Sequence, residues 1–372
     1  MPVGCRLNSQ SVASGGTQNA SACCRHRTYF EGVVDVNRMQ RLTALSLLSA
    51  LVAASCGGGS GSSAPPPAPG PGPGPGPSGT VDNPGQLSPN LVDHNVAALA
   101  TEFHVVIPPA ITPINKLFVF LPGTKGVPND YNFIVQAGAR RGFHTIGLEY
   151  QNSEAVGSVC LNSTDVNCFW NVRRNVILGD IVSLGIPVTK PNSIVTRLTE
   201  AIAYLDQAHK SEGWGQYIRV DGTLDWSKIV VGGHTQGGGH AGVMAKLYAM
   251  SRTCYFSSPP DYSGGPADWM TKPNMTPATQ QYGFAGISDP SVPIADLRAN
   301  FSALGLVGPE TSVDSNVSPY GNSHVLTTDH APNPSTDIGT PLHGLTVRDT
   351  FTPRDSSGQP LFEAAWNYLC FQ

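Results

Sequence analysis

Short apolar runs alternate with longer amphipathic segments through residues 81–372 of this 372-residue sequence. Residues 193–209 place apolar side chains three and four positions apart, which is the spacing of a helix with one buried face. Apolar runs bounded by Gly, Pro or polar residues predict strands over 103–107, 117–121, 143–150, 228–232, 253–257, 282–287 and 323–328. Further helices are expected over 131–141, 238–250 and 293–306. Because strands and helices alternate, we predict an α/β fold with a mainly parallel sheet and helices on both faces.

Residues 151–192 interrupt this alternation. They contain Cys160, Cys168 and Trp170, and a short helix is the only regular element expected there. Open α/β sheets bind ligands at the carboxyl ends of their strands. We therefore interpret the segment as an insertion or cap over that edge, and the shape of a substrate pocket depends on how it folds.

The first residues follow a different pattern. From Met39, a short basic start precedes an apolar run over 42–54, and small residues then lead to Cys56. This is the order of regions in a secretory signal, and the apolar run is too short to span a membrane. We predict a signal peptide over 39–55. Residues 1–38 lack hydrophobic periodicity and are interpreted as a non-native extension before translation starts at Met39.

The cysteine at the predicted cleavage point resembles the lipidated cysteine of a bacterial lipobox. Residues 57–79 contain only Gly, Ser, Ala and Pro, a composition that cannot bury apolar surface and behaves as a tether. We predict an exported lipoprotein in which lipidated Cys56 opens a tether over 56–80. The lipid would anchor a folded domain over 81–372 to a bacterial membrane, at the outer membrane or the periplasmic face. An ordinary cleaved signal with an incidental cysteine is the alternative.

Composition argues against a nucleic acid as partner and against a membrane-spanning helix. Only 13% of the residues are charged, the 22 basic and 26 acidic groups nearly balance, and no basic block occurs. A nucleic acid is therefore not expected as a partner. No run of 18 or more apolar residues is present, which excludes a spanning helix.

Cysteine usage agrees with an oxidising compartment. After Cys56 the chain holds four more cysteines, an even number. We expect a disulfide between Cys160 and Cys168 and another between Cys254 and Cys370. Four buried free thiols are the alternative, and zinc is less favoured because no C-x-x-C spacing occurs.

The sequence GHTQG at 233–237 follows the apolar run 228–232 and precedes a predicted helix. A G-x-[ST]-x-G sequence in this context is typical of a nucleophile elbow, which raises one side chain above the sheet edge. The turn also directs the next N–H and the helix N-terminus at the same point. The run continues to His240 and resembles the G-H-S-Q-G-G-G-H elbow of uncharacterised secreted bacterial members of the α/β-hydrolase superfamily. The resemblance covers most of residues 100–370 and implies an α/β-hydrolase-like fold.

The nucleophile position of this elbow holds Thr235, where the superfamily has Ser. A threonine hydroxyl can attack a carbonyl when a neighbouring base takes its proton. Its methyl group restricts χ1, and a β-branched residue is strained in left-handed backbone. Three interpretations stay open: a slow nucleophile, a ligand-binding protein that has lost catalysis, and a structural turn residue in another α/β fold.

The resemblance implies that an acid and then a histidine follow the nucleophile. Asp289 ends the apolar run 282–287 and is the favoured acid, while Asp261 competes from the preceding strand end. His343 resembles the family's histidine at the start of the final helical region, and His330 is the less favoured alternative. The carboxylate would hold the imidazole's tautomer, and the imidazole would accept the hydroxyl proton. Surface positions are the alternative for each of these residues.

An oxyanion hole needs two N–H donors. The backbone of Gln236, which follows the nucleophile, is expected to supply one. The sequence LPGT at 121–124 resembles the family's His-Gly loop, which makes the backbone of Thr124 the candidate for the other. A plain turn made by Pro-Gly is the alternative.

His234 and His240 invite a metal hypothesis. Their separation of six does not place them on one helix face, and no third ligand stands nearby. No metal and no cofactor are therefore predicted.

We predict hydrolysis of a carboxylic ester or related acyl bond in a small-molecule or lipid-like substrate, through an acyl-Thr235 intermediate. The alternative is a catalytically impaired surface lipoprotein that binds a ligand in the same pocket.

Overall fold

The computed structural model of this protein describes residues 79–96, 102–180, 185–306, 308–334 and 340–372. One sheet contains the strands β1 (Gly85–Leu87), β2 (His104–Ile107), β3 (Leu117–Leu121), β4 (His144–Gly147), β5 (Ile229–His234), β6 (Arg252–Phe256), β7 (Gln281–Gly286), β8 (Thr311–Ser312) and β9 (Val325–Thr328). Their order across the sheet is β1-β2-β4-β3-β5-β6-β7-β9-β8. The pairs β1–β2 and β2–β4 are antiparallel, and every other neighbouring pair is parallel.

The α-helices of this part of the chain are α1 (Pro89–Val92), α2 (Asn132–Arg140), α3 (Val156–Cys160), α4 (Cys168–Leu178), α5 (Ile194–Ala208), α6 (Gln236–Leu247), α7 (Ile294–Leu304), α8 (Pro341–Gly344) and α9 (Glu363–Cys370). Short 3₁₀ helices occupy Pro128–Tyr131, Lys190–Asn192, Lys210–Glu212, Trp214–Tyr217, Trp226–Lys228, Asp268–Thr271, Ala278–Gln280 and Tyr320–Asn322. None of the helices in the described ranges is long and apolar enough to cross a membrane.

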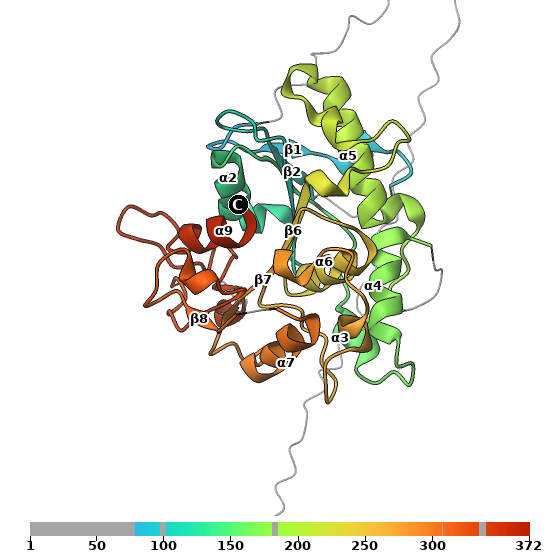
Figure 1. Ribbon diagram of the computed structural model, residues 1–372. Helices are drawn as coiled ribbons and strands as arrows, with labels where there is room; N and C mark the ends of the chain where they lie inside the picture. The colour runs from blue at the N-terminus through green and yellow to red at the C-terminus, as the bar shows by residue number, and fades with distance from the viewer. Residues whose placement is uncertain (1–78, 97–101, 181–184, 307, 335–339) are drawn as a thin grey trace, which may run out of the picture. The chain divides into compact units, whose positions relative to one another are not determined.

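Helices cover both faces of the sheet. Successive side chains of β3 point to opposite faces, as in any strand. Leu117, Val119 and Leu121 join a buried cluster with α4, α5 and α6, whereas Phe118 and Phe120 join a second cluster with α2 and α9. Figure 1 shows α4 and α6 on one side of the sheet, and α2 and α9 on the other. The predicted α/β class, with a mainly parallel sheet between helices, is confirmed.

The predicted strands and long helices are present, and one boundary differs in a way that matters for the site. Strand β5 continues to His234, and α6 already begins at Gln236, two residues before the predicted start. Only Thr235 lies between strand and helix. A polar residue can end a buried strand here because partners elsewhere in the fold satisfy its side chain.

The described residues of the predicted insertion, 151–180 and 185–192, include the α-helices α3 and α4 and a short 3₁₀ helix. Residues near its start, in and beside α3, line a cavity at the sheet edge. The longer helix α4 differs from the expectation of a cap, because its apolar residues pack into the core with α5 and α6. Both expected disulfides are present: Cys160–Cys168 joins α3 to α4, and Cys254–Cys370 joins β6 to α9.

The N-terminal extension, the signal peptide, lipidated Cys56 and the tether are predicted for residues 1–80. The structure describes only Gly79 and Thr80 of these. Those predictions therefore lie outside the described residues, apart from the last two positions of the tether.

Candidate active site

Thr235 forms a sharp bend between β5 and α6. Its backbone has φ 43° and ψ −110°, a left-handed conformation that a β-branched residue adopts only under strain. Neighbouring groups hold it there. The Thr235 N–H donates to the carbonyl of Phe256 at 2.9 Å, and the Ser258 hydroxyl donates to the Thr235 carbonyl at 2.7 Å. Strain at a residue so firmly held is typical of a functional turn.

The glycines on either side of Thr235 lie where backbones touch. A Cβ at Gly233 would lie 2.4 Å from the carbonyl carbon of Gly237, and a Cβ at Gly237 would lie 2.0 Å from the Leu121 carbonyl oxygen. No side chain fits at either position. These glycines therefore let β5, α6 and the end of β3 meet around Thr235, as the elbow motif predicts.

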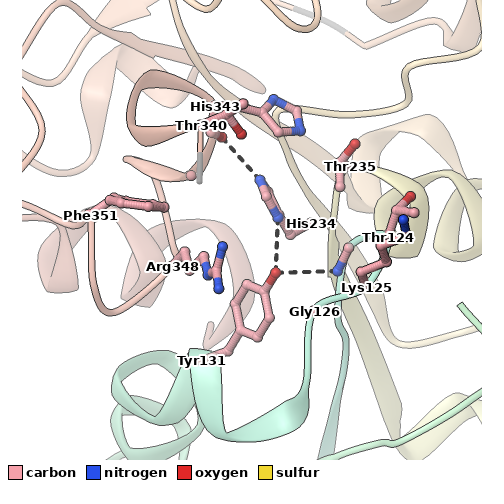
Figure 2. A pocket seen from close by; sticks show the side chains of 12 residues that line it. Thr124, Lys125, Gly126, Tyr131, His234, Thr235, Thr340, His343, Arg348 and Phe351 are labelled. Carbon is pink, nitrogen blue, oxygen red and sulfur yellow. Dashed lines mark hydrogen bonds between the residues drawn. The ribbon is translucent and has the colours of Figure 1, made fainter. Parts of the chain in front are cut away.

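The Thr235 methyl group has a defined place. A Cβ built on Gly123 would lie 2.3 Å from Thr235 Cγ2, so the methyl occupies the space above this glycine. Figure 2 shows the Thr235 hydroxyl and the His343 imidazole on the same side of the pocket. Within the described chain, no hydrogen bond connects the two. Catalytic hydrogen bonds are often long in a free enzyme and tighten when substrate binds.

The structure brings His343 and Asp289 together. Nδ1 of His343, on α8, lies 2.7 Å from Oδ2 of Asp289, whose side chain is fully buried. The other carboxylate oxygen accepts N–H groups from Ser291 at 2.8 Å and Val292 at 3.3 Å. The carboxylate oxygen facing the imidazole is an acceptor, so the partners assign the ring proton to Nδ1. In the neutral ring, Nε2 of His343 is then the nitrogen that can accept a proton.

The competing residues lie elsewhere. Asp261 forms a bidentate ion pair with Arg173, with Nε 2.6 Å from Oδ2, and Trp269 Nε1 donates to the same oxygen at 2.8 Å. Both charged side chains are only 1% exposed. Asp261 therefore has an arginine and no histidine as its partner. His330 is exposed and follows β9, and it lines neither of the two cavities described below.

The two expected oxyanion donors are neighbours. The Thr124 hydroxyl donates to Oε1 of Gln236 at 3.1 Å, and the Val156 N–H donates to the same oxygen at 2.9 Å. Arg173 Nη1 donates to the Gln236 carbonyl at 2.9 Å, which fixes the first residue of α6. Across the described ranges, the backbone N–H groups of Thr124 and Gln236 have no protein acceptor. An oxyanion hole requires two such N–H donors beside the nucleophile, and these two N–H groups are the candidates for it.

Two cavities meet at Thr235, Thr124 and His343. One, of about 240 Å³, has a mixed wall that includes the basic side chains of Lys125 and Arg348 as well as Phe351. The other, of about 230 Å³, has an apolar wall; its lining includes Ala155, Val156, Leu161 and Val292. The proposed reacting groups therefore lie at the junction of a mainly apolar and a mixed, partly basic compartment.

Two side chains close to the elbow, Arg173 and Tyr131, carry no signal in the sequence, and the contacts of a third, His234, carry none. Arg173 and Tyr131 reach it from segments far away along the chain, and only the folded structure brings them there. His234 was placed by the motif as scaffold, but its hydrogen bonds reach two further loops. Pairing between distant segments cannot be read from local patterns.

His240 lies one turn into α6 and is fully buried against the ring of Tyr150. Its two ring nitrogens have no hydrogen-bond partner among the described residues. Burial, with the Arg173 charge as a second cause, holds the pKa of His240 well below its usual value. In the part of the chain that the structure describes, no three His, Cys, Asp or Glu side chains are grouped as metal ligands.

No protein-family model and no curated protein matches this sequence. Among solved structures, native esterase 2 of the Planctomycetes species Thermogutta terrifontis has 18% identity, a TM-score of 0.32, and coverage of 63% of this chain and 79% of that chain. Its butyrate-bound form has 18% identity and a TM-score of 0.33, over 63% of this chain and 80% of that chain. An alpha-beta serine hydrolase homologue from Coxiella burnetii has 13% identity and a TM-score of 0.34, over 56% and 77%.

The strand order and the strand–Thr235–helix elbow of this chain assign its fold. The described chain has an α/β-hydrolase-like fold. A fold of this kind hosts many activities, so function is argued from the site.

Proposed function

We propose that this protein hydrolyses carboxylic esters or related acyl bonds, with Thr235 as nucleophile, His343 as general base and Asp289 as its orienting acid. The proposal is carried by the 2.7 Å hydrogen bond between His343 Nδ1 and the buried Asp289, beside an elbow residue at φ 43°. An imidazole held by a carboxylate in this tautomer can take a hydroxyl proton on Nε2. A turn with a purely structural role would not need a carboxylate–imidazole pair beside it.

The reaction would proceed in two halves. Thr235 Oγ1 attacks the acyl carbon while His343 Nε2 takes its proton, and the carbonyl oxygen becomes an oxyanion facing the N–H groups of Thr124 and Gln236. Collapse breaks the bond to the alcohol, which leaves with the proton from His343. Water, deprotonated by His343, then attacks the acyl-Thr235 ester and releases the acid. The net change is one ester and one water converted into one acid and one alcohol.

The threonine methyl decides how fast this chemistry is. Contact between Cγ2 and Gly123 limits the rotation of the side chain, which favours one direction for the hydroxyl. The same methyl crowds the approach to a tetrahedral carbon, where a misplacement of about 1 Å costs roughly 100-fold in rate. We therefore propose a slower enzyme than one with Ser at this position.

The two cavities support a small-molecule ester as substrate. Each has a volume of 230–240 Å³, and their walls differ in polarity. An apolar substituent on one side of the ester bond and a substituent of mixed polarity on the other would match this arrangement. A long lipid chain would have to extend beyond both compartments.

We also propose that the protein is exported and anchored by lipid on Cys56, with the folded domain at the outer membrane or the periplasmic face. The support for this is the sequence of residues 39–80. Radiolabelled fatty acid should enter the wild type, and Cys56→Ser should abolish the labelling. Labelling that persists in Cys56→Ser would contradict the anchor.

Turnover of short- and long-chain chromogenic esters by the wild type, Thr235→Ala and Thr235→Ser tests the catalytic proposal. Wild-type hydrolysis that the alanine variant loses, by about 10³-fold or more, supports an acyl-threonine mechanism. A large gain in the serine variant would show that the methyl alone slows the enzyme. Equal rates for wild type and alanine variant would overturn the proposal and leave a ligand-binding protein as the better hypothesis.

A further inference from the structure

The imidazole of His234 lies between the two loops that the proposed mechanism uses. On one side its Nδ1 is 3.0 Å from the hydroxyl of Tyr131, which accepts the Gly123 N–H at 3.2 Å. On the other side its Nε2 is 3.0 Å from the backbone carbonyl of His343. Figure 2 shows these contacts as a continuous chain across the pocket. Gly123 directly precedes the proposed oxyanion donor Thr124, so the chain connects the oxyanion loop with the proposed base.

The direction of every hydrogen bond in this chain is fixed by its partners. The carbonyl of His343 can only accept, so Nε2 of His234 carries the ring proton and donates it. Nδ1 of His234 is then an acceptor and receives the Tyr131 hydroxyl. The Tyr131 oxygen in turn accepts from the Gly123 N–H. Only one tautomer of one neutral imidazole satisfies all three contacts.

The backbone of His343 is held by a second donor as well. The Ser257 hydroxyl donates to the same His343 carbonyl at 3.0 Å. Two donors therefore fix the peptide that carries the proposed base, from β5 and from the end of β6. The His343 ring is hydrogen-bonded to Asp289 and lies 4.8 Å, centroid to centroid, from the His234 ring, so its position depends on its backbone, its acid and His234.

Burial keeps His234 in the required neutral form. The residue is 4% exposed, and its buried surroundings lower its pKa well below the usual value, with His343 as a second cause. A protonated His234 would need an acceptor at Nδ1, where the Tyr131 hydroxyl now donates. It would also place a second positive charge beside His343 whenever that base carries its proton.

We propose that His234 is a positioning residue that couples the oxyanion loop to the general base, through Tyr131 on one side and the His343 carbonyl on the other. This proposal rests on the proposed function and adds a residue to it. His234 touches no reacting atom in the scheme. It sets the spacing between the groups that receive the oxyanion and the group that moves the proton.

A matched control exists in the same chain. His144 forms the same two contacts far from the site: its Nδ1 is 2.7 Å from the Tyr217 hydroxyl, and its Nε2 is 2.7 Å from the Glu212 carbonyl. It is also buried. Substitution there changes an equivalent buried bridge without touching the oxyanion loop or His343.

The test compares His234→Leu, His234→Gln and His144→Leu by ester turnover and thermal unfolding. Leucine at 234 removes both hydrogen bonds, and we expect kcat to fall about 100-fold with KM within about twofold. Glutamine, which offers an N–H₂ group as donor and a carbonyl oxygen as acceptor, should recover about tenfold of that loss. His144→Leu should lower the unfolding temperature and leave kcat unchanged. The proposal is overturned if His234→Leu lowers stability as His144→Leu does while kcat stays at the wild-type value.

A measurement that needs no turnover separates this proposal from the proposed function. Nitrogen-15 spectra of histidine-labelled protein should show His234 protonated at Nε2 only, from pH 5 to pH 8, and the Gly123 amide signal should shift in Tyr131→Phe. A proton on Nδ1, or a ring protonated on both nitrogens, would contradict the bridge whatever the activity. Loss of the proposed function alone, seen as equal turnover by wild type and Thr235→Ala, would leave these spectra unchanged.

Discussion

Two buried aspartates follow neighbouring strands, and their partners divide the site into two regions. Asp289 comes after β7 and pairs with the His343 imidazole, while Asp261 comes after β6 and pairs with the Arg173 guanidinium. Both side chains are at most 1% exposed. An imidazole can gain and lose a proton near neutral pH, whereas a guanidinium stays charged. Burial and position at a strand end are therefore shared, and the partner side chain distinguishes the proposed role of Asp289 in proton transfer from the structural role of Asp261.

The largest expected effect comes from Asp289→Asn. The amide keeps the shape of the carboxylate but can no longer stabilise an imidazolium or hold the Nδ1–H tautomer. We expect kcat to fall by about 10³- to 10⁴-fold with an unchanged unfolding temperature. Steady-state kinetics and thermal unfolding check this. A fall of less than about tenfold in kcat would remove the distinction between the two aspartates.

Asp261→Asn should lower the free energy of unfolding. Removing one partner of a buried ion pair leaves Arg173 unpaired, which costs about 3–5 kcal/mol of unfolding free energy. Activity per folded molecule should stay within about tenfold of wild type, because Arg173 can still donate to the Gln236 carbonyl. Urea unfolding and active-site-normalised turnover measure the two quantities.

The double variant Arg173→Met/Asp261→Leu tests whether Asp261→Asn is unstable because it leaves a buried charge unpaired. It replaces the ion pair by apolar side chains, so no buried charge is left without a partner, and stability should largely return. If the double variant is as unstable as Asp261→Asn, then the ion pair itself, and not the unpaired charge, carries the effect.

Gly123→Ala tests the packing on the His343 side. The new Cβ would lie 2.3 Å from Thr235 Cγ2 and 2.9 Å from His234 Nδ1, so the nucleophile must move. We expect kcat to fall roughly 100-fold. In the Thr235→Ser background the methyl is absent, and part of the loss should return. An equal loss in both backgrounds would contradict the contact between methyl and glycine.

The smallest effect is expected from His240→Met, on the pH dependence of stability; His240 lies close enough to Arg173 for that charge to lower its pKa. Its pKa lies well below the usual value in the folded state, so below about pH 6.5 the unfolded chain binds a proton that the folded chain does not. Stability of the wild type should therefore fall as the pH drops below that point. The variant should remove about one proton from this dependence, as measured by urea unfolding at pH 5, 6 and 7. An unchanged dependence would mean that His240 binds its proton equally in both states.

Most of the fold could be predicted from local sequence patterns. The strands in the middle of the sheet, the elbow and the Cys160–Cys168 disulfide could be predicted, because apolar runs, glycines and two cysteines eight positions apart leave local signals. The Cys254–Cys370 disulfide joins residues 116 positions apart, and its prediction relied on the even number of cysteines and not on a local pattern. The short strands β1 and β8 were missed, since three and two residues are too few to form a pattern. Helix α9 was missed as well, although its residues pack against the second buried cluster.

The site was predictable as far as its chemistry follows single positions. The sequence proposed both aspartates as acids but could not choose between them by contact, because Arg173 lies 88 positions from Asp261 and His343 lies 54 positions from Asp289. The C-terminal boundary of β5 was predicted two residues too early for the same reason. His234 reads as a polar break, yet Tyr131, 103 positions away, makes it a buried strand residue.

Reaction with a fluorophosphonate, followed by mass spectrometry of the digested protein, tests the central claim most directly. We expect one adduct, on the peptide that holds Thr235, which is absent in Thr235→Ala and strongly reduced in His343→Ala. An intact Thr235 peptide after prolonged exposure, or an adduct that persists in Thr235→Ala, would contradict it.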